Sequence, residues 1–120
     1  YGSQNIGCFV MQNVIDQMEV QEFKKRNWKI LGIINILSPS YHKLDSIYDV
    51  LKNDDRGTYK DYIYSVNFLV QEKYINIRNS ASHKYEDLAD CDDYSELEAN
   101  LSSKGTRLLK GNIIDDMVTG

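Results

Sequence analysis

The stretch TYKDYIYSVNFLVQEKYI, residues 58–75, decides the fold because it joins a capped helix directly to a strand. Thr58 is a favoured N-cap residue, and the residues after it repeat with a helical period. At 100° per residue, one face of this helix collects the apolar side chains. They are Tyr59, Tyr62, Ile63, Val66, Leu69 and Val70. From Tyr74 to Arg78 the chain alternates with period 2 instead, which predicts a strand.

Two further helices are predicted before this stretch. Residues 22–37 form the strongest helical pattern, with an apolar face wide enough to be central to the core. That face is Trp28, Ile30, Leu31, Ile34 and Leu37. Pro39 follows it and cannot continue a helix. A second helix is expected within residues 42–52, and its apolar face is Leu44, Ile47, Tyr48 and Leu51. The turn-forming residues 53–57 separate it from Thr58.

The chain after Arg78 predicts a loop, a strand and a last helix. Residues 79–96 are polar and acidic, without apolar period, and indicate a long loop. Residues 97–101 alternate again and are expected to pair antiparallel with the first strand. Ser102 or Ser103 then caps a final helix, for which Gly111 is a plausible end. Residues 112–120 form a short tail with apolar side chains.

The N-terminal residues 1–21 read as a helical arm outside the main domain. We leave residues 1–3 out of the fold argument, since Tyr1 in place of Met suggests a trimmed or engineered start. Val14, Ile15 and Met18 recur at helical spacing. A short apolar stripe of this kind must be buried somewhere. Two interpretations stay open: the arm lies on the core, or it forms a homodimer contact.

Two motifs carry a family resemblance. The first is Thr58-x3-Tyr62-x3-Val66-Asn67-Phe68-Leu69-x2-Glu72-x-Tyr74-Ile75, and the second is Leu101-Ser102-Ser103-Lys104-Gly105-x3-Leu109. Together they resemble winged-helix domains, and are most similar to the small YjcQ-type proteins of bacteria and their prophages. The resemblance spans residues 22–111. It implies an α+β, mainly helical fold with three helices, a two-stranded antiparallel wing and a C-terminal helix, preceded here by the N-terminal helical arm.

The resemblance implies a small, cytoplasmic, DNA-binding transcriptional regulator of bacterial or prophage origin. In such a fold the third helix enters the major groove, and phosphates are held by basic side chains. Residues of the types that read base edges lie on or next to the outer face of that helix; they are Thr58, Lys60, Asn67 and Gln71. The candidate phosphate contacts are Lys43, Arg56 and Lys73, with the basic group at residues 24–29 on the flank.

The alternative is a module that binds protein and not DNA. Tyr64 and Phe68 lie one turn apart on the outer face of the third helix, and aromatic anchors are typical of protein interfaces. Either of them could instead pack against another helix or the arm. The formal net charge is −4, from 18 acidic and 14 basic residues. Residues 79–98 hold seven acids and one base, so this loop carries −6 and the remainder +2. An acidic wing is repelled by phosphate, so it points away from DNA or the partner is a protein.

No enzymatic, metal-binding or cofactor-binding motif emerges from the sequence. The acidic run from Asp90 lacks the Gly and Glu that an EF-hand loop requires, because Ser95 and Leu101 occupy those positions. Cys8 and Cys91 fit neither a zinc signature nor a disulfide framework, which favours reduced thiols in the cytoplasm. No run of residues is apolar enough to span a membrane.

Overall fold

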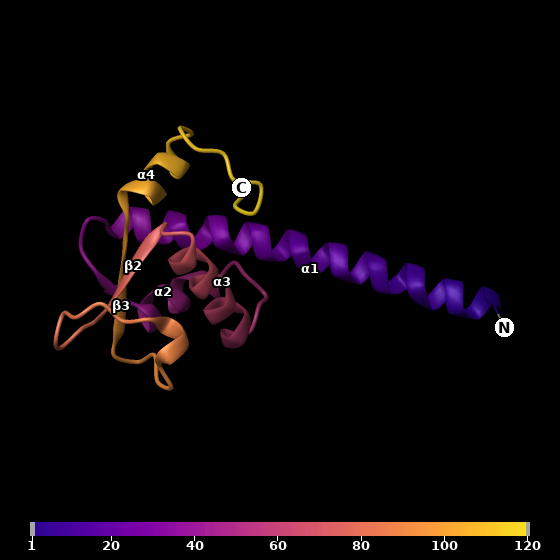
Figure 1. The fold of residues 1–120 in the computed structure, drawn as a ribbon, viewed down its shortest axis with the longest axis horizontal. Helices are drawn as coiled ribbons and strands as arrows, with labels where there is room; N and C mark the ends of the chain where they lie inside the picture. The colour runs from indigo at the N-terminus through magenta and orange to yellow at the C-terminus, as the bar shows by residue number, and fades with distance from the viewer. Residues whose placement is uncertain (1, 120) are drawn as a thin grey trace.

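A computed structural model describes the backbone of residues 2–119 and the side chains of residues 14–119 (Figure 1). Within this range the chain is an α+β fold, about half of it helical, with a small antiparallel sheet. The helices are α1 (Gly2–Leu37), α2 (Leu44–Leu51), α3 (Tyr59–Gln71) and α4 (Ser103–Leu109), with a short 3-10 helix, η1 (Leu88–Asp90). The strands are β1 (His42–Lys43), β2 (Ile75–Asn79) and β3 (Leu97–Leu101).

The first helix is longer than the sequence pattern suggests. The boundary predicted at residue 21 falls inside α1, which continues without a break from Gly2 to Leu37. Thirty-six residues at 1.5 Å each give about 54 Å, which accounts for most of the 60 Å long axis of the molecule. The N-terminal part of α1 extends away from the other elements (Figure 1), and residues 14–20 are all exposed. These residues therefore do not lie on the core; Cys8, Val10 and Met11 are outside the described side chains.

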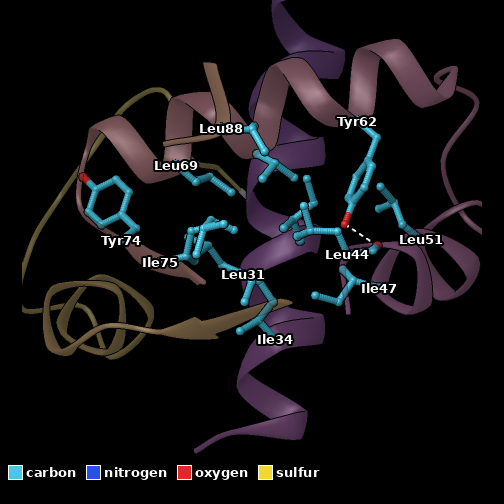
Figure 2. Packing of buried hydrophobic residues seen from close by; sticks show 14 of the residues in the cluster. Leu31, Ile34, Leu44, Ile47, Leu51, Tyr62, Leu69, Tyr74, Ile75 and Leu88 are labelled. Atoms are coloured by element: carbon cyan, nitrogen blue, oxygen red, sulfur yellow. Dashed lines mark hydrogen bonds between the residues drawn. The ribbon is translucent and has the colours of Figure 1, made fainter. Parts of the chain in front are cut away.

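The core lies where the second half of α1 crosses the other elements (Figure 2). Ile30, Leu31 and Ile34 of α1 are buried as predicted. The placement of Trp28 in the core was wrong, since this side chain is 36% exposed and is not among the buried residues. Residues 28–37 are apolar on more than one face, so their pattern alone does not determine which face turns inward.

The two helices after Pro39 match the sequence pattern closely. Leu44, Ile47 and Leu51 of α2 are buried. Thr58 caps α3 with a reciprocal capping box, because its hydroxyl accepts from the Asp61 amide while the Asp61 carboxylate accepts from the Thr58 amide. The Tyr62 hydroxyl donates to the Leu44 carbonyl at 2.7 Å (Figure 2), which joins α3 to the start of α2.

The sheet has the order β1-β3-β2, with both neighbouring pairs antiparallel. The pairing of residues 75–79 with 97–101 confirms the predicted hairpin. The two-residue β1 was not predicted, because so short a strand is defined only by its pairing, His42 with Ala99 and Lys43 with Glu98. Ser102 caps α4 through the Gly105 amide, and Gly111 has a positive φ of 83° just after this helix.

Candidate functional site

The outward face of α3 gathers the residues predicted to contact a partner. Tyr62, Ser65, Val66 and Leu69 turn inward. On the opposite side, Lys60 and Gln71 are exposed, Tyr64 is 69% exposed and Asn67 is half-buried. At 100° per residue these four positions form one strip along the helix. We call this strip the α3 face; it consists of Lys60, Tyr64, Asn67 and Gln71.

The other predicted DNA contacts lie at the ends of elements. Thr58 is exposed, but its hydroxyl is already used in the capping box. Lys73 follows the end of α3 in a left-handed conformation, with φ of 68°. Arg56 is exposed in the turn before α3, and Lys43 is exposed on β1, at the start of α2. Of the residues predicted to contact DNA, only Lys60, Asn67 and Gln71 therefore lie together on the α3 face.

Phe23 of α1 contacts both aromatic residues that were predicted as protein anchors. Its ring packs edge-to-face against Tyr64 at 5.5 Å and against Phe68 at 5.3 Å between centroids. Phe68 is half-buried against the core, so it supports the fold. Tyr64 leaves most of its surface to solvent. The structure thus separates the pair: Phe68 is held by α1, and Tyr64 remains available.

The α1 side of the α3 face is a hollow of about 620 Å³. It opens between α1, the first turns of α3 and the C-terminal tail, and four carboxylates line it. They are Asp16, Glu19, Glu22 and Asp61. The only base in its lining is Arg26, whose Nε already pairs with Asp55 Oδ2 at 2.8 Å. Hydrogen bonds from Thr58 hold the pKa of Asp61 below its usual range, so this carboxylate is charged at neutral pH. The hollow beside Tyr64 is therefore acidic.

The other side of the α3 face carries the acidic part of the loop. Residues 86–96, here called the acidic segment, hold six acids and no base. The segment does not hang free, because Leu88 of η1 is 2% exposed and joins the core, and η1 packs against α3. The pKa of Tyr59 is raised above its ordinary value by burial, by its hydrogen bond to Asp45, and by the negative charges of Asp45 and Asp93. Asp93 is thus one of the charges that act on Tyr59, the first residue of α3.

The predicted wing loop is two structures and not one. Residues 80–83 form a short turn after β2, closed by hydrogen bonds between the backbones of Asn79, His83 and Lys84. The returning chain then lies along β2, with Tyr85 bridging Arg78. Lys84 and His83 stay on this exposed hairpin tip, whereas the −6 charge lies entirely in the acidic segment. A count of charged residues over 79–98 does not distinguish the hairpin tip from the acidic segment.

Arg78 is fixed at the base of the hairpin tip. Its guanidinium lies 3.6 Å from the ring centre of Tyr41 and pairs with Glu98 at 2.6 Å. Burial and a hydrogen bond with Tyr85 raise the pKa of Tyr41 to about 12. This basic side chain was not considered from the sequence, and its contacts make it a support for the sheet.

The acidic segment also holds a thiol, that of Cys91. Burial and then the neighbouring acids, Glu86 and Asp90 among them, raise the pKa of the Cys91 thiol, which disfavours the nucleophilic thiolate. Among residues 14–119, no three His, Cys, Asp or Glu side chains come together as metal ligands would. None of the helices in the described part of the chain is both long and apolar enough to cross a membrane.

Comparison with protein-family models, with curated proteins and with solved structures finds no match to this chain.

Proposed function

We propose that this chain is a winged-helix interaction module whose α3 face binds the basic surface of a protein partner. The element order, and a hairpin joined to a short first strand, support the winged-helix assignment, since this fold places three helices before a two-stranded wing. The observation that carries the binding proposal is the charge on both sides of the α3 face. Asp61, Glu19 and Glu22 line the hollow on one side, and on the other side the acidic segment packs against α3 through η1.

This arrangement favours cationic protein side chains over phosphate. Binding to duplex DNA draws most of its affinity from Lys and Arg that neutralise phosphates. A DNA backbone that approached the α3 face would meet carboxylates on both sides, with Lys60 the only base on the face itself. A partner with Lys or Arg side chains would gain from the same carboxylates. Tyr64 lies between these carboxylates. Its exposed ring is of the kind that anchors protein interfaces and makes cation–π contacts with Lys or Arg.

A second candidate function, DNA binding, is favoured by one specific observation. Lys60, Asn67 and Gln71 share one outward strip of α3, and these residue types pair with base edges in the major groove. Arg56 and Lys73 lie near the two ends of the same helix, where they would reach phosphates. DNA binding by this surface would require that the acidic segment does not approach the phosphate backbone of the DNA.

One titration separates the two candidates. The full chain is titrated against a fluorescent duplex DNA of mixed sequence, and against a fluorescent peptide rich in Lys and Arg, at low and near-physiological salt. The proposal predicts binding of the peptide and none of the duplex. Binding of the duplex that falls steeply with salt and is weakened by Lys60→Ala would overturn the proposal in favour of DNA.

Two matched tyrosine variants test the surface itself. Tyr64→Ala should weaken peptide binding about tenfold, as truncation of an anchor residue does. Tyr85→Ala removes a tyrosine of similar exposure, 73% against 69%, from a different part of the surface and should leave binding unchanged. Equal effects of the two variants would show that the α3 face is not the binding surface.

A further inference from the structure

The outer face of α1 carries a second candidate binding surface, an exposed seam that is separate from the α3 face. Residues 14, 18, 21, 25, 28 and 32 follow one another in alternating steps of four and three. This is the spacing of the a and d positions of a coiled coil, whose side chains pack against another helix. The seam faces away from Ile30, Leu31 and Ile34, the residues that α1 buries in the core. In the described chain the N-terminal half of the seam is uncovered, with Met18 59% exposed, and the C-terminal half borders α2, where nothing lies within 4 Å of a Cβ placed on Gly32.

Exposed apolar side chains lie on both halves of this seam. The N-terminal half holds Val14 and Met18. The C-terminal half holds Trp28 and, one turn beyond Gly32, Ile36, which is 81% exposed. There the face widens into a groove of about 360 Å³ that reaches Val50 at the end of α2. The C-terminal half is thus a groove with a glycine in its floor, whereas Val14 and Met18 lie on a part of α1 that extends away from the other elements (Figure 1).

These halves are complementary to each other in an antiparallel pair of chains. If Met18 of one copy faces Trp28 of the other, then Val14 faces Gly32, and Gln21 faces Lys25. The N-terminal half of each seam then lies in the groove of the other copy, with Val14 packed over the missing side chain of Gly32. The seam is opposite the core side of α1, so the two globular parts lie on the outside of the pair.

Charge selects the same orientation. The charges next to the seam are Glu22 and Lys25, since Asp16 and Glu19 line the hollow beside α3 and Arg26 is buried against Asp55. An antiparallel pair in this register places Glu22 next to Lys25 of the other copy. A parallel pair in register would instead place Lys25 against Lys25 in the seam. Like charges in these positions are unfavourable.

We propose that the occupant of this face is a second copy of the chain, which pairs antiparallel through the α1 seam from Val14 to Ile36. The pair joins two α3 faces in one assembly and leaves both of them exposed. The proposal does not rest on the identity of the partner of the α3 face.

The oligomeric state of the full chain tests the pairing. Sedimentation equilibrium over a range of concentrations should show a monomer–dimer equilibrium. Met18→Asp, which places a charge in the seam, should raise the dissociation constant at least tenfold (about 1.4 kcal/mol). Val20→Asp is the matched control, because Val20 is exposed on the same arm but away from the seam, and it should leave the dimer intact. A monomer at every concentration, or equal weakening by the two variants, would overturn the proposal.

Disulfide trapping tests the orientation. In a chain with Cys8→Ser and Cys91→Ser, the double variant Val14→Cys/Gly32→Cys should form a covalent dimer on mild oxidation. The two new thiols of one chain are 18 residues apart on one helix, about 27 Å, so they cannot join within a chain. Val14→Cys alone should stay uncrosslinked, since the antiparallel pair separates the two copies of that position by a similar length. A covalent dimer of the single variant would establish a parallel pair and refute the proposed orientation.

Discussion

Nε of Arg26, in the middle of α1, lies 2.8 Å from Oδ2 of Asp55, in the turn before α3, and the two side chains are only 7% and 9% exposed. The same carboxylate oxygen accepts from the Gly57 amide at 3.0 Å. A Cβ on residue 57 would collide with the guanidinium, so the turn closes on Arg26 only because Gly57 has no side chain. This ion pair therefore ties the turn between α2 and α3 to the long helix.

Removing Asp55 should destabilise the protein strongly. Asp55→Ala leaves the Arg26 guanidinium buried and unpaired, which costs about 3–5 kcal/mol of unfolding free energy. Asp54→Ala removes the neighbouring acid, which is 84% exposed and pairs with Lys29 at 3.4 Å, and should cost less than about 1 kcal/mol. Urea denaturation of the two variants checks the prediction. A similar small loss for both would mean that Arg26 finds water or another acceptor.

The hydroxyl of Tyr62 should contribute more than its exposed neighbour on the same helix. Tyr62→Phe leaves the buried Leu44 carbonyl without this donor and should cost about 1–3 kcal/mol. Tyr64→Phe removes a hydroxyl in solvent and should change the unfolding free energy by less than about 0.5 kcal/mol. Thermal unfolding followed by circular dichroism compares the two. A loss for Tyr64→Phe as large as for Tyr62→Phe would contradict the buried hydrogen bond.

Leu88 should hold the acidic segment in place. Leu88→Ala removes a fully buried side chain and should cost about 2–5 kcal/mol. It should also speed amide hydrogen exchange in residues 86–96 relative to β2, because η1 loses its anchor in the core. Ile114→Ala, at a 94% exposed apolar position, is the control and should change neither quantity. Unchanged exchange in Leu88→Ala would show that other contacts, such as those of Tyr94, hold the segment.

The capping box of α3 should give the stability a defined pH dependence. The pKa of Asp61 is lowered in the fold, mainly by the hydrogen bond from the Thr58 amide. A lowered pKa means that this contribution is fully present above the ordinary value of 3.8 and is lost as the pH falls through the folded pKa. Asp61→Asn should therefore destabilise the protein at neutral pH, by a margin that shrinks in strong acid. A margin that is constant down to the lowest accessible pH would contradict a charged Asp61 in the cap.

The parts of the fold that depend on local patterns were predictable from the sequence. Thr58 and Ser102 caps, the buried faces of α2 and α3, and the pairing of β2 with β3 follow from residue types a few positions apart. The length of α1 was not predictable in the same way. Residues 14–20 turn no side chain into the core, so nothing local separates a free arm from a continuous helix.

The candidate site depends on contacts between distant residues, and the sequence predicts less of it. The α3 face follows from helical period alone, so Lys60, Tyr64, Asn67 and Gln71 were grouped correctly. Phe23 meets Tyr64 and Phe68 from more than 40 positions away along the chain, and no pattern within either helix indicates this contact. The acidic hollow has the same origin, since its carboxylates come from α1 and α3. The only signal for the inward turn of the loop was Leu88, an isolated apolar residue in an acidic run.

The outward position of Trp28 determines which spectroscopic signals will be informative. It is the only tryptophan of the chain, and it lies on the surface and not among the buried residues. Its fluorescence will report mainly on the polarity at the outer side of α1, with a shift to shorter wavelength when that side is covered. Intrinsic tryptophan emission therefore provides a label-free signal for whatever docks beside Trp28.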